Sequence, residues 1–161
     1  MVLTQNQTAE IKGAIASALE RVYSQDFSLI QREAHERSIA FRFGLYFSEI
    51  ISFTSFGDDE ELTIDFDYNR NGEGVKDMEG FSLSHGVYPD IILHRRGYNN
   101  KNVVALEFKG HWTANGRDEE KLIGFTHPIR NNYQYGLGLF IRLGRTLGEC
   151  ELVYYKNGDL E

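Results

Sequence analysis

Apolar residues recur at helical spacing in two stretches near the start of the chain. The first stretch begins with the capping-box pattern Thr4–Gln7, and its apolar positions are Ile11, Ala14, Ile15, Ala18, Leu19 and Val22. A second capping-box pattern, Ser28–Gln31, predicts a longer helix that ends at about Phe53. One stripe of this longer helix consists of Glu36, Ala40, Phe43, Phe47 and Ile50, so a carboxylate heads an otherwise apolar face.

The rest of the chain reads as strands separated by turns. Strands are predicted over Leu62–Tyr68, Asp90–Arg95, Val103–Lys109, Leu137–Leu143 and Glu151–Tyr155. The glycine-rich segment 69–86 is predicted to be a long loop, and Asn115 with Gly116 can cap a short helix that ends before Pro128. The order helix, helix, three strands, helix, two strands predicts an α+β fold with a mixed sheet.

Composition restricts the class of protein. The chain has 161 residues, the usual size of one domain, and no linker interrupts it, so residues 1–161 are predicted to form a single domain. An apolar fraction of 41% with only two prolines excludes a disordered chain and a collagen-like repeat. Cys150 is the only cysteine, which excludes an internal disulfide and a four-cysteine zinc site and favours a reducing compartment.

Targeting signals and charge narrow the expected location and partners. The first residues contain no basic segment that leads into an apolar stretch, and no apolar run approaches the ~18 residues of a membrane span. We therefore expect a soluble, cytoplasmic protein with no membrane partner. The net charge of −7 argues against a broad, non-specific grip on nucleic acid, but a small basic cleft or a bound cation can reverse the field locally.

The most informative segment is the pair of predicted strands that contain Asp90 and Glu107. The turn residues 97–100 between them predict a hairpin in which the numbers of paired residues sum to 197. In an unbulged hairpin, Asp90 then lies directly opposite Glu107, with Cβ atoms about 4.5–5.5 Å apart. Lys109 follows Glu107 by two residues and lies on the same face.

Two opposed carboxylates repel each other unless a cation lies between them. Carboxylate, carbonyl and water oxygens suit Mg²⁺ or Mn²⁺, so Asp90 and Glu107 are candidate metal ligands. Lys109 can then act on an attacking water or stabilise the charge that grows on a phosphate in the transition state. The alternative is that these residues form an ordinary Lys–Glu ion pair on a solvated strand face.

The sequence Pro89-Asp90, a spacer, and Glu107-Phe108-Lys109 resembles the PD-(D/E)xK motif of the restriction-endonuclease-like nuclease superfamily. The core of that family is an α/β/α sandwich-like αβββαβ arrangement with a mixed central sheet. The predicted elements follow this order from about Ser28 onward, after one extra N-terminal helix. Shorter segments are also similar to a group of small, largely uncharacterised bacterial nuclease-like proteins, namely 35–38, 67–72, 118–122 and 135–139.

The resemblance implies a role for each matching residue. Asp90 and Glu107 correspond to the family's metal-binding acids, and the backbone carbonyl of Phe108 corresponds to a further ligand of the divalent cation. Lys109 corresponds to the catalytic lysine. Glu36 matches a glutamate that many such nucleases carry on the first core helix, directed at the site.

The activity implied by the resemblance is that of an Mg²⁺- or Mn²⁺-dependent nuclease, either an endonuclease or an exonuclease, that hydrolyses phosphodiester bonds with an activated water. Nucleic acid is the expected partner, with DNA favoured, and the oligomeric state stays open. The candidate nucleic-acid contacts are Lys121, on the helix that packs beside the site in such folds, and Arg37, Arg70 and Arg95, whose guanidinium groups fit phosphate. Two alternatives stay open: a nuclease-fold protein that binds or assembles without catalysis, and a domain in which the acids form a structural charge cluster.

Several other polar and aromatic residues carry weaker expectations. Asp65 and Asp67 are predicted to form a solvated strand face rather than a second metal site, and His94 is expected at the surface. The remaining histidines lack the spacing of a zinc site. Trp112 is expected either to pack in the core or to provide a platform for base stacking.

Overall fold

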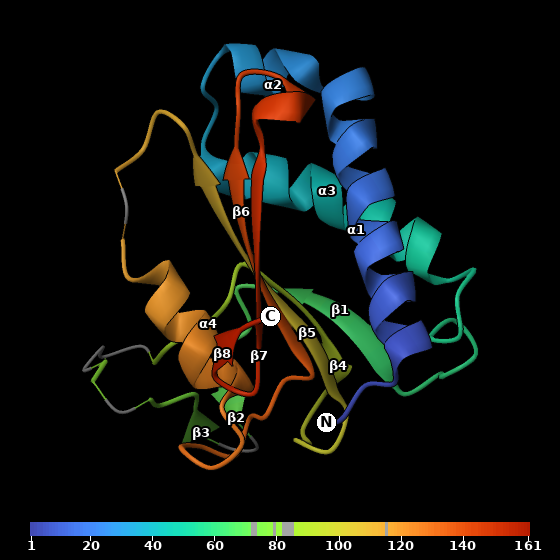
Figure 1. The fold of residues 1–161 in the computed structure, drawn as a ribbon, viewed down its shortest axis with the longest axis vertical. Helices are drawn as coiled ribbons and strands as arrows, with labels where there is room; N and C mark the ends of the chain where they lie inside the picture. Colours follow the sequence, from blue (N-terminus) through green and yellow to red (C-terminus); the bar gives the residue numbers. More distant parts are fainter. Residues whose placement is uncertain (72–73, 79, 82–85, 115) are drawn as a thin grey trace.

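The computed structural model describes residues 1–71, 74–78, 80–81, 86–114 and 116–161 (Figure 1). Its first helix, α1 (Gln5–Gln25), begins with the predicted capping box. The backbone N–H of Gln7 donates to Thr4 Oγ1 at 3.2 Å, and the N–H of Thr4 donates to Gln7 Oε1 at 3.0 Å. The predicted apolar stripe is buried along the whole helix, which confirms this element. In the described part of the chain, neither α1 nor any other helix is both long and apolar enough to cross a membrane.

The prediction of one helix from Ser28 to about Phe53 is wrong. The structure has a single turn, α2 (Phe27–Gln31), and a separate helix, α3 (Glu36–Ile51). Glu33 between them adopts a left-handed backbone with φ 50°, which ends α2. His35 then caps α3, because its Nδ1 accepts a hydrogen bond from the N–H of Arg37 at 3.3 Å. Glu36 therefore lies in the first turn of α3, where the helix dipole favours a carboxylate.

Six strands of the described residues form one mixed sheet in the order β1-β4-β5-β6-β7-β8. Their bounds are β1 (Leu62–Phe66), β4 (Ile91–Arg95), β5 (Asn102–Gly110), β6 (Leu137–Leu143), β7 (Glu151–Lys156) and β8 (Asp159–Leu160). β5 and β6 are parallel and the other neighbours are antiparallel, which confirms the predicted α+β fold with a mixed sheet. β8 is an addition to the prediction. So is a two-stranded sheet of β2 (Arg70–Asn71) and β3 (Gly74–Val75) within the predicted loop.

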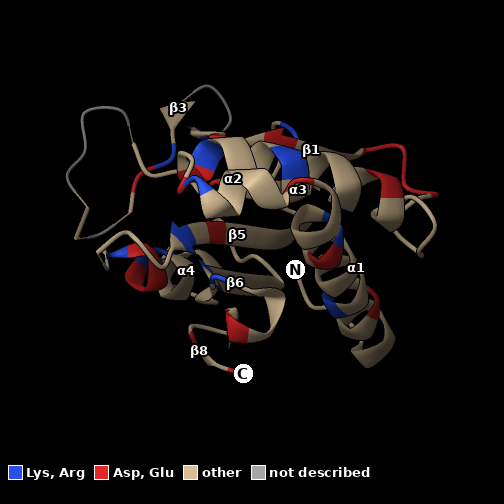
Figure 2. Ribbon diagram, turned by 90° about the horizontal axis from the view of Figure 1, so that it is seen from above, with Lys and Arg blue, Asp and Glu red and all other residues tan. Residues whose placement is uncertain are grey.

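Helices cover both faces of the sheet, as Figures 1 and 2 show. α3 packs on one face with α1 beside it, and together with the sheet they enclose the larger core, which includes Phe43, Phe47, Leu106 and Phe108. α4 (Asp118–Thr126) covers the other face over a second core, which includes Phe125. The predicted cap at Asn115 lies outside the described residues, and Arg117 is the residue that precedes the helix.

The hairpin of β4 and β5 has the predicted register at its open end, next to Asp90 and Glu107. Ile91 pairs with Leu106, and the two following pairs also sum to 197. Near the turn the register shifts by one residue, because His94 pairs with Asn102. The prediction of a hairpin without a bulge is therefore wrong at this end. The side chain of Asn102 is buried and donates to the Tyr133 carbonyl at 2.5 Å, which ties this residue to a neighbouring loop. Asp90 directly precedes β4, in register with Glu107.

Asp65 and His94 are buried, so the expectation that both are solvated is wrong. β1 lies beside β4, and His94 Nε2 lies 2.9 Å from Asp65 Oδ2. The guanidinium of Arg96 donates to both carboxylate oxygens of Asp65. The sequence pattern indicates a polar face but does not reveal that His94 of β4 and Arg96 of the following turn contact this acid.

Candidate active site

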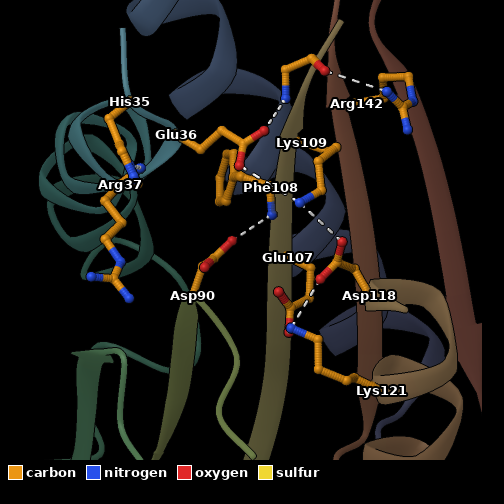
Figure 3. Close-up of polar contacts among 11 residues, drawn as sticks. His35, Glu36, Arg37, Asp90, Glu107, Phe108, Lys109, Asp118, Lys121 and Arg142 are labelled. Atoms are coloured by element: carbon orange, nitrogen blue, oxygen red, sulfur yellow. Dashed lines mark hydrogen bonds and ion pairs between the residues drawn. The ribbon is translucent and has the colours of Figure 1, made fainter. Parts of the chain in front are cut away.

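Two carboxylates bind the free edge of β5. β4 begins at Ile91, opposite Leu106, so the last residues of β5 extend beyond its end. The N–H of Phe108 donates to Asp90 Oδ2 at 2.7 Å, and the N–H of Gly110 donates to Glu36 Oε1 at 2.7 Å (Figure 3). Asp90 from the hairpin and Glu36 from α3 are thus brought to the same edge of one strand.

The carbonyl of Phe108 belongs to the same edge. The N–H and C=O of one strand residue point to the same side of the strand, so this carbonyl lies on the side where its N–H meets Asp90. If the register of Ile91 with Leu106 is continued by two residues, residue 108 lies opposite residue 89. Residue 89 is a proline, which has no N–H to donate. The sequence Pro-Asp therefore leaves a backbone oxygen of β5 without a donor from β4, next to a carboxylate.

Glu107 and Lys109 meet residues of α4 on the face of the sheet opposite Phe108. Lys121 Nζ lies 2.7 Å from Glu107 Oε1 and 3.0 Å from Asp118 Oδ1. Lys109 Nζ lies 3.2 Å from Asp118 Oδ2 and 3.7 Å from Glu36 Oε2 (Figure 3). Two lysines and four carboxylates thus form one cluster at the end of the hairpin.

The acids at the centre of this cluster are poorly stabilised as anions. Glu107 is only 2% exposed, and its burial, together with the charge of Asp90, raises its pKa well above the usual range despite the nearby Lys121. Burial also raises the pKa of Asp90, more than the hydrogen bond from Phe108 and the charge of Lys121 lower it. Burial therefore disfavours the anionic form of both acids, and the charge of Asp90 disfavours it further at Glu107.

Asp118 and the two lysines show the opposite behaviour. Burial alone would raise the pKa of Asp118, but the hydrogen bonds and charges of Lys121 and Lys109 outweigh it and hold the pKa below the usual value. Burial alone would lower the pKa of each lysine, but Asp118 and Glu36 raise that of Lys109, and Glu107 and Asp118 raise that of Lys121. Both lysines are thus held as cations beside the site.

The predicted nucleic-acid contacts lie in different parts of the structure. Arg37 projects from α3 beside Asp90, is 62% exposed, and pairs with Asp67 at 3.3 Å. Lys121 lies inside the acid cluster rather than on an open surface. Arg95 lies at the opposite end of β4 from Asp90, where it pairs with Glu61 at 2.9 Å, and Arg70 is exposed on β2.

Sequence reasoning missed Asp118 as part of the site. Its signal is present, since Asp118 and Lys121 are three residues apart on one helix and therefore share a face. Trp112 packs against the main core and lies on the backbone of Gly110, where an added Cβ would come within 2.4 Å of the indole ring. Of its two expected roles, the structure supports core packing.

The donor set at the β5 edge suits a divalent cation. Mg²⁺ is typically bound through one or two carboxylates and completes its coordination with water. Asp90, Glu107 and the Phe108 carbonyl supply two carboxylates and one backbone oxygen, and a cation would offset the two acids that burial leaves poorly stabilised. Among the described residues, no three side chains of His, Cys, Asp and Glu are gathered as a metal site.

Glu36, Asp90, Glu107, Phe108 and Lys109 come together from three separate segments of the chain. Comparison with protein-family models, with curated proteins and with solved structures gives no match.

Proposed function

We propose that the protein is an Mg²⁺- or Mn²⁺-dependent phosphodiesterase that hydrolyses nucleic acid, with DNA as the favoured substrate. The order of its elements α3, β1, β4, β5, α4 and β6 is consistent with the αβββαβ core of the PD-(D/E)xK nuclease superfamily that its motif resembles. The single observation that carries the proposal is the pairing of buried Glu107 with half-buried Asp90, beside a backbone carbonyl that receives no hydrogen bond from Pro89. An acid with a strongly raised pKa, such as Glu107, is typical of a functional site.

A divalent cation held there would polarise a phosphate oxygen and make a water molecule a better nucleophile. Asp90, Glu107 and the Phe108 carbonyl would hold it. Lys109 is placed by Asp118 and Glu36 so that its ammonium can stabilise negative charge on the reacting phosphate. Lys121 compensates Glu107, so a bound cation would compete with this lysine for the same carboxylate.

The non-catalytic alternative fits the site less well. A protein that only binds nucleic acid needs positive charge on its surface, whereas here the two lysines and the two poorly stabilised acids are half-buried or buried together. A structural charge cluster fits less well too, because it would bring the pKa of its acids down rather than up. Figure 2 shows acidic and basic positions side by side where α4 faces the end of β5.

The test combines cleavage with metal binding. Wild-type protein is incubated with labelled single- and double-stranded DNA and RNA in Mg²⁺ or Mn²⁺, and Asp90→Ala serves as the variant that lacks a metal ligand. Calorimetric titration with Mn²⁺ should give a binding isotherm for the wild type that Asp90→Ala loses, and cleavage should disappear with it. Equal Mn²⁺ heats in the two proteins, or no cleavage of any substrate by the wild type, would contradict the proposal.

A further inference from the structure

A groove runs from Asp90 along the outer face of α3, and we call it the α3 groove. Its inner part, a pocket of about 170 Å³, is lined by Arg37, Ala40, Phe41, Phe66, Asp67 and Asp90. Its outer part, of about 430 Å³, is lined by Leu29, Arg37, Ser38, Phe41 and Arg42. Because both parts share Arg37 and Phe41, the α3 groove is continuous with the candidate active site.

An aromatic ring lies exposed at the centre of this groove. Phe41 is 51% exposed, and its ring packs against Phe66 with the centroids 5.6 Å apart. One side of the Phe41 ring therefore contacts Phe66, and part of the ring stays exposed in the groove. Apolar surface in water is unfavourable, so a flat aromatic partner would stabilise this arrangement.

An exposed cation, Arg37, lies next to the ring of Phe41. Arg37 pairs with Asp67 at 3.3 Å, and both side chains are more than one-third exposed. An exposed pair of this kind contributes little stability, so the guanidinium can exchange Asp67 for a stronger anion. Its fork geometry fits a phosphate group.

We infer that the nucleotide next to the cleaved bond is unpaired, with its base stacked on Phe41 and its phosphate bound by Arg37. This inference rests on the proposed function and adds the substrate class, a single strand or a single-stranded end. In a duplex the faces of a base are covered by its neighbours, so only an unpaired base can stack on a side chain. The inner pocket is smaller than the usual range for drug-sized ligands, about 300–1,000 Å³, and suits one planar ring.

A protein partner is the main competitor for this surface. Leu45 follows Phe41 by one helical turn and is 44% exposed, so α3 presents a short apolar stripe. Two features favour the nucleotide: the inner pocket opens at Asp90 itself, and Arg37 supplies a charge that complements phosphate. A surface that docks a protein needs neither an opening at Asp90 nor a charge that complements phosphate.

The experiment measures binding of labelled single-stranded DNA and RNA and of matched duplexes by fluorescence anisotropy, with Mn²⁺, in a Lys109→Ala background that limits cleavage. Phe41→Ala should weaken single-strand binding on the order of tenfold, whereas Phe41→Tyr should retain it, since stacking contributes about 1–3 kcal/mol per base. Phe53→Ala is the matched control, because Phe53 is 85% exposed just beyond α3 and lies outside the groove. Phe41→Trp adds a direct readout: a single strand should quench its added indole fluorescence, and should not quench that of Phe53→Trp.

Each outcome bears on a different claim. Equal single-strand affinities in the Phe41→Ala and Phe53→Ala proteins would overturn the inference, and wild-type cleavage in Mn²⁺ would then leave the proposed function standing. If Phe41→Ala and Leu45→Ala both convert a wild-type oligomer to a monomer in sedimentation and leave nucleic-acid affinity unchanged, the α3 groove is a protein interface and the inference is overturned. Wild-type protein that neither binds Mn²⁺ nor cleaves would contradict the proposed function itself.

Discussion

Two groups of charged residues lie along β4, and the pKa of their acids is shifted in opposite directions. In the first group, Asp65 pairs with Ile92 in the sheet, accepts hydrogen bonds from Arg96 and lies 2.9 Å from His94 Nε2. Burial alone would raise the pKa of Asp65, but the hydrogen bonds and charge of Arg96 and His94 outweigh it and hold the pKa far below the usual value. This acid is an anion that its surroundings stabilise.

In the second group, burial raises the pKa of both Asp90 and Glu107, and the charge of Asp90 raises that of Glu107 further, although two lysines are close. The fold is therefore able to compensate a buried acid fully, since it does so at Asp65. The contrast indicates that the incomplete compensation at Asp90 and Glu107 serves something other than stability, as expected where a ligand supplies the missing charge.

The largest expected effect is on catalysis, at Lys109. If its ammonium stabilises charge in the transition state, Lys109→Ala should reduce single-turnover cleavage by about 10²–10³, or ~3–4 kcal/mol, with little change in KM. Lys109→Arg should not restore the rate, because the broader guanidinium does not fit the place of an ammonium between Asp118 and Glu36.

Lys101→Ala is the matched control for this prediction. Lys101 also contacts two carboxylates, Asp59 and Glu61, at 2.6 Å each, but it lies in the hairpin turn away from the β5 edge. Its loss should leave the cleavage rate unchanged. An unchanged rate in Lys109→Ala as well would remove the lysine from the mechanism.

The comparison of Asp65 with Asp90 is tested by replacing each of them with asparagine. Asp65→Asn replaces an anion bound by Arg96 and His94, and should cost about 2 kcal/mol of unfolding free energy, the usual contribution of hydrogen bonds to charged groups. Asp90→Asn keeps an oxygen that can accept the Phe108 N–H and removes a poorly stabilised charge, so stability should stay the same or rise.

Urea unfolding of both variants without metal, at neutral pH, measures this difference. The order of the two unfolding free energies distinguishes the clusters, because Asp65→Asn must be clearly less stable than Asp90→Asn. A loss of several kcal/mol in Asp90→Asn would identify Asp90 as a structural residue, and the contrast between the clusters would disappear.

The sequence predicts those parts of the site that depend on one hairpin. Strand alternation and a recognisable turn are enough to place Asp90 opposite Glu107 and Lys109 on the same face, and the observed pairs next to Asp90 have this register. The bulge at His94 does not disturb it, because it lies on the turn side of these pairs. The order of the main helices and strands also follows from the pattern of apolar and polar residues, because the predicted apolar faces are buried in the two cores.

The sequence does not predict contacts between separate elements. Lys121 reaches Glu107 because packing of α4 on the sheet fixes the distance between helix and strand, and no local pattern encodes that distance. The burial of Asp65 likewise depends on β1 lying beside β4. The break before α3 depends on His35, which is an unusual capping residue and is not recognisable from a capping box.

The smallest expected effect is the pH dependence of stability, and it differs in sign between the two clusters. Glu107 has a raised pKa in the folded protein, so its contribution to stability is present below the unfolded value near 4.5 and is lost as the pH rises through the folded value. Glu107→Gln removes this loss of stability, because glutamine does not ionise. Relative to the wild type, the variant should therefore gain stability as the pH rises from about 4.5 toward neutrality.

Asp65 has the opposite sign, because its lowered pKa gives a contribution that is present above about 3.8 and is lost as the pH falls through the folded value. The destabilisation caused by Asp65→Asn should thus shrink in acid, whereas the gain from Glu107→Gln should grow toward neutral pH. Urea unfolding of the three proteins from pH 3 to pH 8 without metal measures both trends. Repeating the series with Mn²⁺ should reverse the Glu107→Gln trend, because ionised Glu107 then stabilises the folded protein through the bound cation. Parallel pH curves for the wild type and Glu107→Gln, with and without Mn²⁺, would show that folding leaves the pKa of Glu107 unchanged, which would contradict the contrast with Asp65.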